Sequence, residues 1–173
     1  MIVDYSLQFI SLSYKMKFIS GKKWWKVVMS MFMGEFNHTI DAKGRLIIPS
    51  KYREQLGDKM VVTKGLDTCL YLYPMEEWEK MVEKFAGLNL LKESERKFKR
   101  QFIAGASECE FDKQGRILLP ASLRTHVGID KDVVLAGMME RIEIWDKDRW
   151  EQATNIDDMN EIAEMMAERG LSL

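Results

Sequence analysis

Hydrophobic and polar positions along the chain form short strand-like runs separated by turns and by helix-like stretches, and this order occurs twice. Each half starts with a strand, a tight turn and a short apolar strand that ends at a proline. A short helix, two further strands and an amphipathic helix follow. In the first half we predict strands over 34–40, 45–48, 59–63 and 69–73, a short helix between Pro49 and Gly57, and a longer helix over 75–85.

The clearest sign of the duplication is a nine-residue motif: an aspartate, two variable residues, glycine, arginine, three apolar residues and proline. It runs from Asp41 to Pro49 and again from Asp112 to Pro120. Only two copies are present, whereas a solenoid needs at least about three repeats. We therefore expect a mainly β fold with helices (α+β), in which two halves share one core about a pseudo-two-fold axis. Both apolar triplets, 46–48 and 117–119, should lie inside that core.

The remaining segments have no counterpart in the motif and divide the chain further. A charged segment, 91–106, reads as a connecting helix, and the acidic, methionine-rich end reads as a helix that packs or contacts another subunit. The predicted boundaries are 1–30 for a leader outside the fold, 31–90 for the first half, 91–106 for the connecting helix, 107–155 for the second half and 156–173 for the C-terminal helix.

The leader does not have the layout of an export signal, because its lysines follow its apolar stretch. Trp24 and Trp25 are flanked by lysines, so an interfacial membrane anchor stays open as an alternative. We favour translated upstream sequence, since Met29, Met31 and Met33 could each be a start.

Composition narrows the class of protein. The chain has 173 residues, is 46% hydrophobic and has a formal net charge of −1, and residues 31–173 alone hold 21 basic and 26 acidic residues. A nucleic-acid-binding protein with this balance must concentrate its positive charge locally. The two cysteines, Cys69 and Cys109, lie in no metal-binding spacing, so we expect no metal, no cofactor and a cytoplasmic location.

The repeated turns hold the candidate binding residues. An arginine that directly follows a tight turn projects from a rigid tip, which suits bidentate contact with a guanine edge or a phosphate. An ion pair that merely closes each turn is an equally good interpretation of this spacing. The predicted DNA-binding residues are Lys43, Arg45, Arg53, Lys113, Arg116 and Arg124, and the turn-forming residues are Asp41, Gly44, Asp112 and Gly115.

Catalysis has no positive support in the sequence. His38 and His126 lie in no catalytic motif, and no phosphate-binding loop or nucleophile elbow is present. A hydrolase that uses Asp41 and Asp112 would rest on their pairing alone. We expect a protein that is not an enzyme and takes no small-molecule substrate.

The run from Gly34 to Pro49, with its second copy at 112–120, resembles the MraZ family of bacterial transcription regulators. The resemblance covers about 31–173 and implies two SpoVT/AbrB-type domains that form a barrel of swapped hairpins. It further implies a ring-shaped homo-oligomer at the nucleoid that binds G-rich direct repeats in promoter DNA upstream of its own division and cell-wall genes. The family normally begins near Met31 or Met33. Tryptophan has the single codon TGG, so Trp24-Trp25 requires the DNA sequence TGGTGG just upstream of that start, which is what translation of an operator would produce. An AbrB-type antitoxin or protein-interaction module is the alternative.

Overall fold

The computed structural model describes residues 31–155 and 159–171, so the predictions for the leader lie outside the described residues. Each half contains four strands and three helices in the same order. The first half consists of β1 (Phe32–Thr39), β2 (Arg45–Ile47), α1 (Ser50–Leu56), β3 (Lys59–Lys64), β4 (Leu70–Pro74), α2 (Met75–Ala86) and α3 (Glu93–Ile103). The second consists of β5 (Ser107–Glu110), β6 (Arg116–Leu118), α4 (Ala121–Val127), β7 (Asp132–Met139), β8 (Arg141–Asp146), α5 (Lys147–Thr154) and α6 (Met159–Glu168).

This order confirms the predicted strands and helices, and it extends the duplication beyond the motif. The helices α3 and α6 occupy the same place in the two halves. Pro49 and Pro120 directly precede α1 and α4, where a fixed φ suits the start of a helix and a missing N–H costs no helical hydrogen bond. No helix in the described residues is long and apolar enough to cross a membrane.

Six strands form one antiparallel sheet in the order β1-β7-β8-β4-β3-β5. The two hairpins, β3-β4 and β7-β8, meet where β4 pairs with β8. Each half sends its first strand to the other half, because β1 pairs with β7 and β5 pairs with β3. Buried Glu143 lies at the β4–β8 junction and accepts hydrogen bonds from two residues of its own strand, Arg141 at 2.8 Å and Trp145 at 3.1 Å, and Arg141 contacts β4 by lying over the ring of Tyr71.

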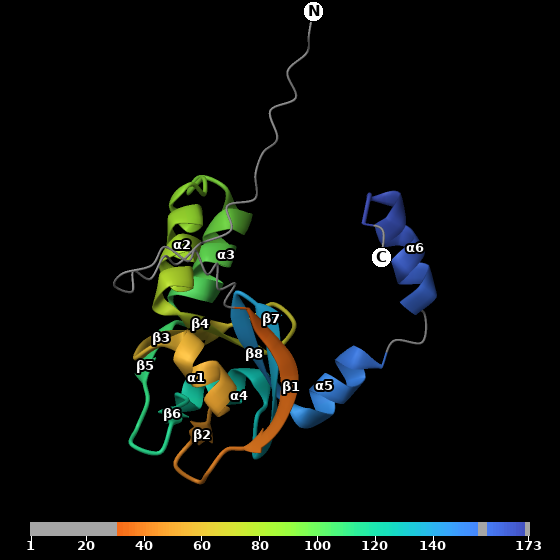
Figure 1. Cartoon of the computed structure of the whole chain (residues 1–173). Coiled ribbons are helices and arrows are strands. Elements are labelled where there is room, and N and C mark those ends of the chain that lie inside the picture. The colour runs from red at the N-terminus through yellow and green to blue at the C-terminus, as the bar shows by residue number, and fades with distance from the viewer. Residues whose placement is uncertain (1–30, 156–158, 172–173) are drawn as a thin grey trace, which may run out of the picture. The chain divides into compact units, whose positions relative to one another are not determined.

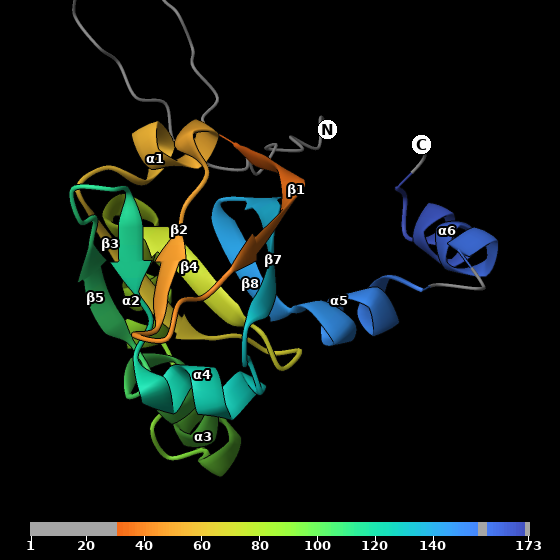
Figure 2. The same ribbon diagram turned by 90° about the horizontal axis from the view of Figure 1, so that it is seen from below.

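The remaining two strands, β2 and β6, pair only with each other in an antiparallel ribbon. An isolated bridge between Ile40 and Leu46 links this ribbon to the end of β1. In Figures 1 and 2 the ribbon lies against one face of the six-stranded sheet, between α1 and α4, and α2 and α3 lie on the opposite face. The sheet is open at β1 and β5, so the swapped-hairpin barrel that the family resemblance implied is not confirmed: single strands are exchanged, and no closed barrel forms in the described residues.

Two hydrophobic clusters fill the two faces of the sheet. The larger one joins both halves, because Leu46 and Ile48 of the first half and Ile117 and Leu119 of the second are all fully buried in it. The smaller one places aromatic residues of α2 and α3, such as Phe85 and Phe102, against the other face. The shared core is therefore confirmed, and its centre lies directly beneath the ribbon.

The prediction that both apolar triplets are entirely buried is wrong at their middle residues. Ile47 is 45% exposed and Leu118 is 59% exposed. In an extended strand successive side chains point to opposite faces, so Leu46 and Ile48 can enter the core only if Ile47 points outward. The same alternation exposes Leu118 between Ile117 and Leu119.

Candidate nucleic-acid interface

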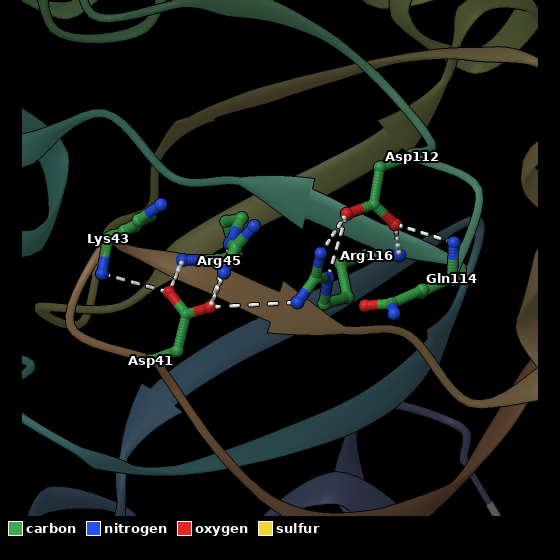
Figure 3. A network of polar contacts seen from close by, with 6 residues as sticks. All are labelled: Asp41, Lys43, Arg45, Asp112, Gln114 and Arg116. Atoms are coloured by element: carbon green, nitrogen blue, oxygen red, sulfur yellow. Dashed lines mark hydrogen bonds and ion pairs between the residues drawn. The ribbon is translucent and has the colours of Figure 1, made fainter.

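The aspartate of each motif organises its turn through both carboxylate oxygens. Oδ1 of Asp41 accepts hydrogen bonds from the backbone N–H of Lys43 at 2.9 Å and of Arg45 at 3.0 Å. Oδ2 accepts from the Arg45 guanidinium, with Nε at 2.7 Å and Nη2 at 2.6 Å. Figure 3 shows this network beside its counterpart in the second half. The turn is thus closed by backbone and side-chain contacts within five residues.

The second turn repeats the first almost atom for atom. Oδ1 of Asp112 accepts from the backbone N–H of Gln114 at 2.8 Å and of Arg116 at 3.0 Å, and Nε of Arg116 donates to Oδ2 at 2.7 Å. One contact joins the two turns, because Nη1 of Arg116 lies 3.7 Å from Oδ2 of Asp41. The turn-closing ion pairs that the spacing suggested are therefore present in both halves.

These contacts keep both aspartates charged. Hydrogen bonds from the Arg45 side chain and backbone lower the pKa of Asp41 to about 2, and Arg116 lowers that of Asp112 to about 2 in the same way. A depressed carboxyl pKa means that this contribution to stability is present above the ordinary aspartate pKa and disappears as the pH falls through about 2. At neutral pH each tip consequently presents a paired, oriented guanidinium.

The ion pairs with the aspartates leave part of each arginine side chain exposed to solvent. Within the described residues, the contacts of Arg45 involve Nε and Nη2, and its side chain is 33% exposed. Arg116 is 20% exposed. A guanidinium has five N–H donors, so the Nη1 end of Arg45 stays available to an acceptor pair while the carboxylate fixes the orientation of the group. All three guanidinium nitrogens of Arg116 face a carboxylate, since Nε and Nη2 contact Asp112 and Nη1 faces Asp41, so Arg116 has fewer free donors than Arg45.

The lysines of the motif lie on the turns themselves. Both Lys43 and Lys113 are exposed, but they occupy different turn positions: Lys43 corresponds to Gln114, and Lys113 corresponds to Ala42. Four cations and two carboxylates therefore surround the ribbon ends, on a chain that is otherwise acidic. A nucleic-acid-binding protein of this composition would need such a local concentration of positive charge.

Arg53 and Arg124 hold the turn of the opposite half. The guanidinium of Arg124 lies against Gly44, and that of Arg53 lies against Gly115. Backbone bonds cross in the same sense: Gly44 O accepts from Leu119 N at 2.9 Å, and Gly115 O accepts from Ile48 N at 3.1 Å. The structure thus places these two predicted DNA-binding arginines half-buried beneath the tips, where each packs against the turn of the other half.

Replacing Gly115 by alanine is expected to destabilise the protein strongly for a surface turn. The residue has a φ of +74°, and a Cβ would lie 2.7 Å from Cζ of Arg53. Strain at positive φ costs about 1–2 kcal/mol, and the new Cβ would in addition displace the half-buried guanidinium of Arg53 from the turn. Gly128→Ala is the matched control, because Gly128 has a φ of +72° but a Cβ there would make only an ordinary contact, at 3.5 Å. Urea unfolding should show the larger loss for Gly115→Ala, and equal losses would contradict the packing of Arg53 on the turn.

Sequence reasoning missed the outward-facing apolar residues of the ribbon. Arg45 pairs with Leu118 and Ile47 pairs with Arg116, so each arginine has an exposed apolar neighbour on the other strand. The signal was present in the motif, because a three-residue apolar run in a strand must turn its middle residue away from the face of its neighbours.

The other residues considered for chemistry lie apart from one another. His38 is in β1, and burial lowers its pKa; His126 is in α4, 3.5 Å from Gln101. Cys69 and Cys109 are free, buried and in separate hydrophobic clusters. Among the described residues no group of three or more His, Cys, Asp or Glu side chains is arranged to hold a metal ion.

Comparison with known proteins gives a consistent result across both halves. The family model described as "MraZ protein, putative antitoxin-like" matches the chain twice, over residues 31–101 and 102–170. A protein of Lachnoclostridium phytofermentans named "Transcriptional regulator MraZ" is 57% identical over 142 residues, which cover 82% of this chain and 99% of that protein. Proteins of the same name from Thermoanaerobacter sp. strain X514 and Clostridium tetani are 56% and 49% identical, covering 78% and 82% of this chain and 95% and 100% of theirs.

Proposed function

The chain belongs to the MraZ family, and we propose that it is a sequence-specific DNA-binding regulator of transcription that contacts promoter DNA with its two arginine-tipped turns. The observation that carries this proposal is the pair of matching turns, one at each end of the short β2–β6 ribbon, with an oriented guanidinium on each. The names of the relatives support transcriptional regulation as the general role.

The chemistry of the tips favours DNA over a small ligand. A guanidinium fixed by a carboxylate can donate two parallel hydrogen bonds to O6 and N7 of guanine, which is the commonest specific contact in the major groove. Exposed Lys43 and Lys113 beside each tip suit the phosphate backbone. Arg53 and Arg124 position the turns from beneath, and their direct contact with DNA stays a prediction.

The two arginine-tipped turns of one chain contact two neighbouring sites on the DNA, and an oligomer of several chains contacts a series of repeated sites. A homo-oligomeric ring with identical tips would bind direct repeats far more tightly than one chain binds one repeat, because each further contact is intramolecular. We propose such a ring at G-rich repeats upstream of the protein's own gene, among division and cell-wall genes. In the same proposal the protein regulates its own gene, lies in the cytoplasm at the nucleoid and is not an enzyme.

The arginines provide the test. Arg45→Ala and Arg116→Ala should each weaken binding to a duplex spanning the DNA upstream of the Met31 codon by about 1–3 kcal/mol. Arg45→Lys should recover only part of the loss, because it keeps the charge and not the planar fork. The control is Arg100→Ala, an exposed arginine of α3, which should bind like the unchanged chain.

Binding should be measured by fluorescence anisotropy at several salt concentrations, with urea unfolding to show that each variant is folded. A folded Arg45→Ala, Arg116→Ala double variant with unchanged affinity would refute the assignment of the tips. If the unchanged chain bound no promoter DNA at all, the alternative, an AbrB-type antitoxin or protein-interaction module, would replace the proposal.

A further inference from the structure

The outer face of the β2–β6 ribbon is half cationic and half apolar. Arg45 and Ile47 point outward from β2, and Arg116 and Leu118 point outward from β6. The register places Arg45 opposite Leu118 and Ile47 opposite Arg116, so the four side chains form a small pattern with the pseudo-two-fold symmetry of the halves. We call these four residues the ribbon face.

The two apolar residues of the ribbon face belong to neither hydrophobic cluster of the described residues. The core beneath the ribbon is filled by Leu46 and Ile117, both fully buried, whereas Ile47 and Leu118 are 45% and 59% exposed. A polar residue at either outward position would be compatible with the strand. Exposed aliphatic side chains beside two oriented arginines therefore point to a partner that has apolar groups next to polar acceptors.

The major groove of DNA has that combination. Guanine presents the acceptors O6 and N7 there, and the 5-methyl group of thymine is the apolar group on a base edge. A two-stranded β-ribbon fits within the groove. Outward residues two apart on a strand, such as Arg45 and Ile47, lie about 6.6 Å from each other, which is close to two base-pair steps of about 3.4 Å. Residues directly opposite on the paired strands, such as Arg45 and Leu118, have Cβ atoms about 5 Å apart, so both neighbours of an arginine fall within one or two base-pair steps.

We propose that Ile47 and Leu118 determine sequence specificity by contacting thymine methyl groups beside the guanines read by Arg45 and Arg116. This inference rests on the proposed function, and it assigns the recognition of thymine in the preferred site to two named side chains. Each arginine and its cross-strand apolar neighbour then act as one reading unit. The two units are related by the same pseudo-symmetry as the two turns.

Deoxyuridine provides a direct test, because it differs from thymidine only in lacking the methyl group. Duplexes that the full chain binds are first selected from a randomised pool and then synthesised with either thymidine or deoxyuridine throughout. Removing a contacted methyl-sized group should weaken binding by about fourfold for each contact. Dissociation constants are compared for the unchanged chain, Ile47→Ala, Leu118→Ala and the double variant.

The unchanged chain should bind the thymidine duplex at least about fourfold more tightly than the deoxyuridine duplex. The double variant should bind both duplexes equally, at the level of the unchanged chain on deoxyuridine. Leu66→Ala is the control, because Leu66 is a 62% exposed leucine in the loop between β3 and β4. It should discriminate like the unchanged chain.

Two results would overturn the inference: no discrimination by the unchanged chain, or full discrimination by the double variant. If the double variant kept its discrimination but changed its assembly size in light scattering, the ribbon face would be a protein contact, and the inference would again fail. Failure of the proposed function has a different signature, since the unchanged chain would then select no sequence from the pool.

Discussion

An Ile48→Asp chain is expected not to fold. Ile48 is fully buried in the cluster that joins the two halves, directly beneath the ribbon. Its backbone N–H also donates to Gly115 O of the other half. An unpaired carboxylate there costs several kcal/mol, and the packing of the isoleucine is lost as well, against a total stability of about 5–15 kcal/mol for a typical domain.

The neighbouring residue supplies a matched control. Ile47→Asp makes the same chemical change one position away, but Ile47 points outward and its carboxylate would stay hydrated. Circular dichroism and urea unfolding should show a cooperative transition for Ile47→Asp and none for Ile48→Asp. Similar unfolding curves for the two variants would contradict the sidedness of β2.

Separating the two halves is expected to have an equally large effect. A fragment of residues 31–106 keeps the β3–β4 hairpin, but the other sheet partners of β1, β3 and β4, which are β7, β5 and β8, all belong to the other half. It also loses Arg124, which lies against Gly44. The fragment should be unfolded, or should pair with a second copy that replaces the missing half.

Mixing provides the control for this experiment. Fragments 31–106 and 107–173 should regain structure when combined, because together they restore every strand pair of the sheet. Analytical ultracentrifugation and circular dichroism would follow the recovery. A monomeric 31–106 fragment that melts cooperatively would show that the exchange of β1 and β5 is dispensable and that each half holds its own core.

The sequence by itself determined the features that depend on a few consecutive residues, which are the turns and the helix starts. The turns follow from five consecutive residues, in which an aspartate accepts two backbone N–H groups and a glycine takes a positive φ, and Asp41 and Gly44 do so as the motif predicts. Helix starts at Pro49 and Pro120 are equally local. The repeated motif also predicted that the chain consists of two halves related by pseudo-symmetry. The resemblance to the family was recognised from the same residues.

Strand pairing and sidedness were decided only by the tertiary structure. Three apolar residues in a row carry no alternation, so Ile47 and Leu118 look like core residues until the ribbon is paired and one of its faces is covered. The exchange of β1 and β5 depends on contacts between residues up to about a hundred positions apart, which no local pattern encodes. Arg53 and Arg124 support the opposite turns for the same reason: the packing of one half on the other, and not the spacing along the chain, brings each guanidinium to its glycine.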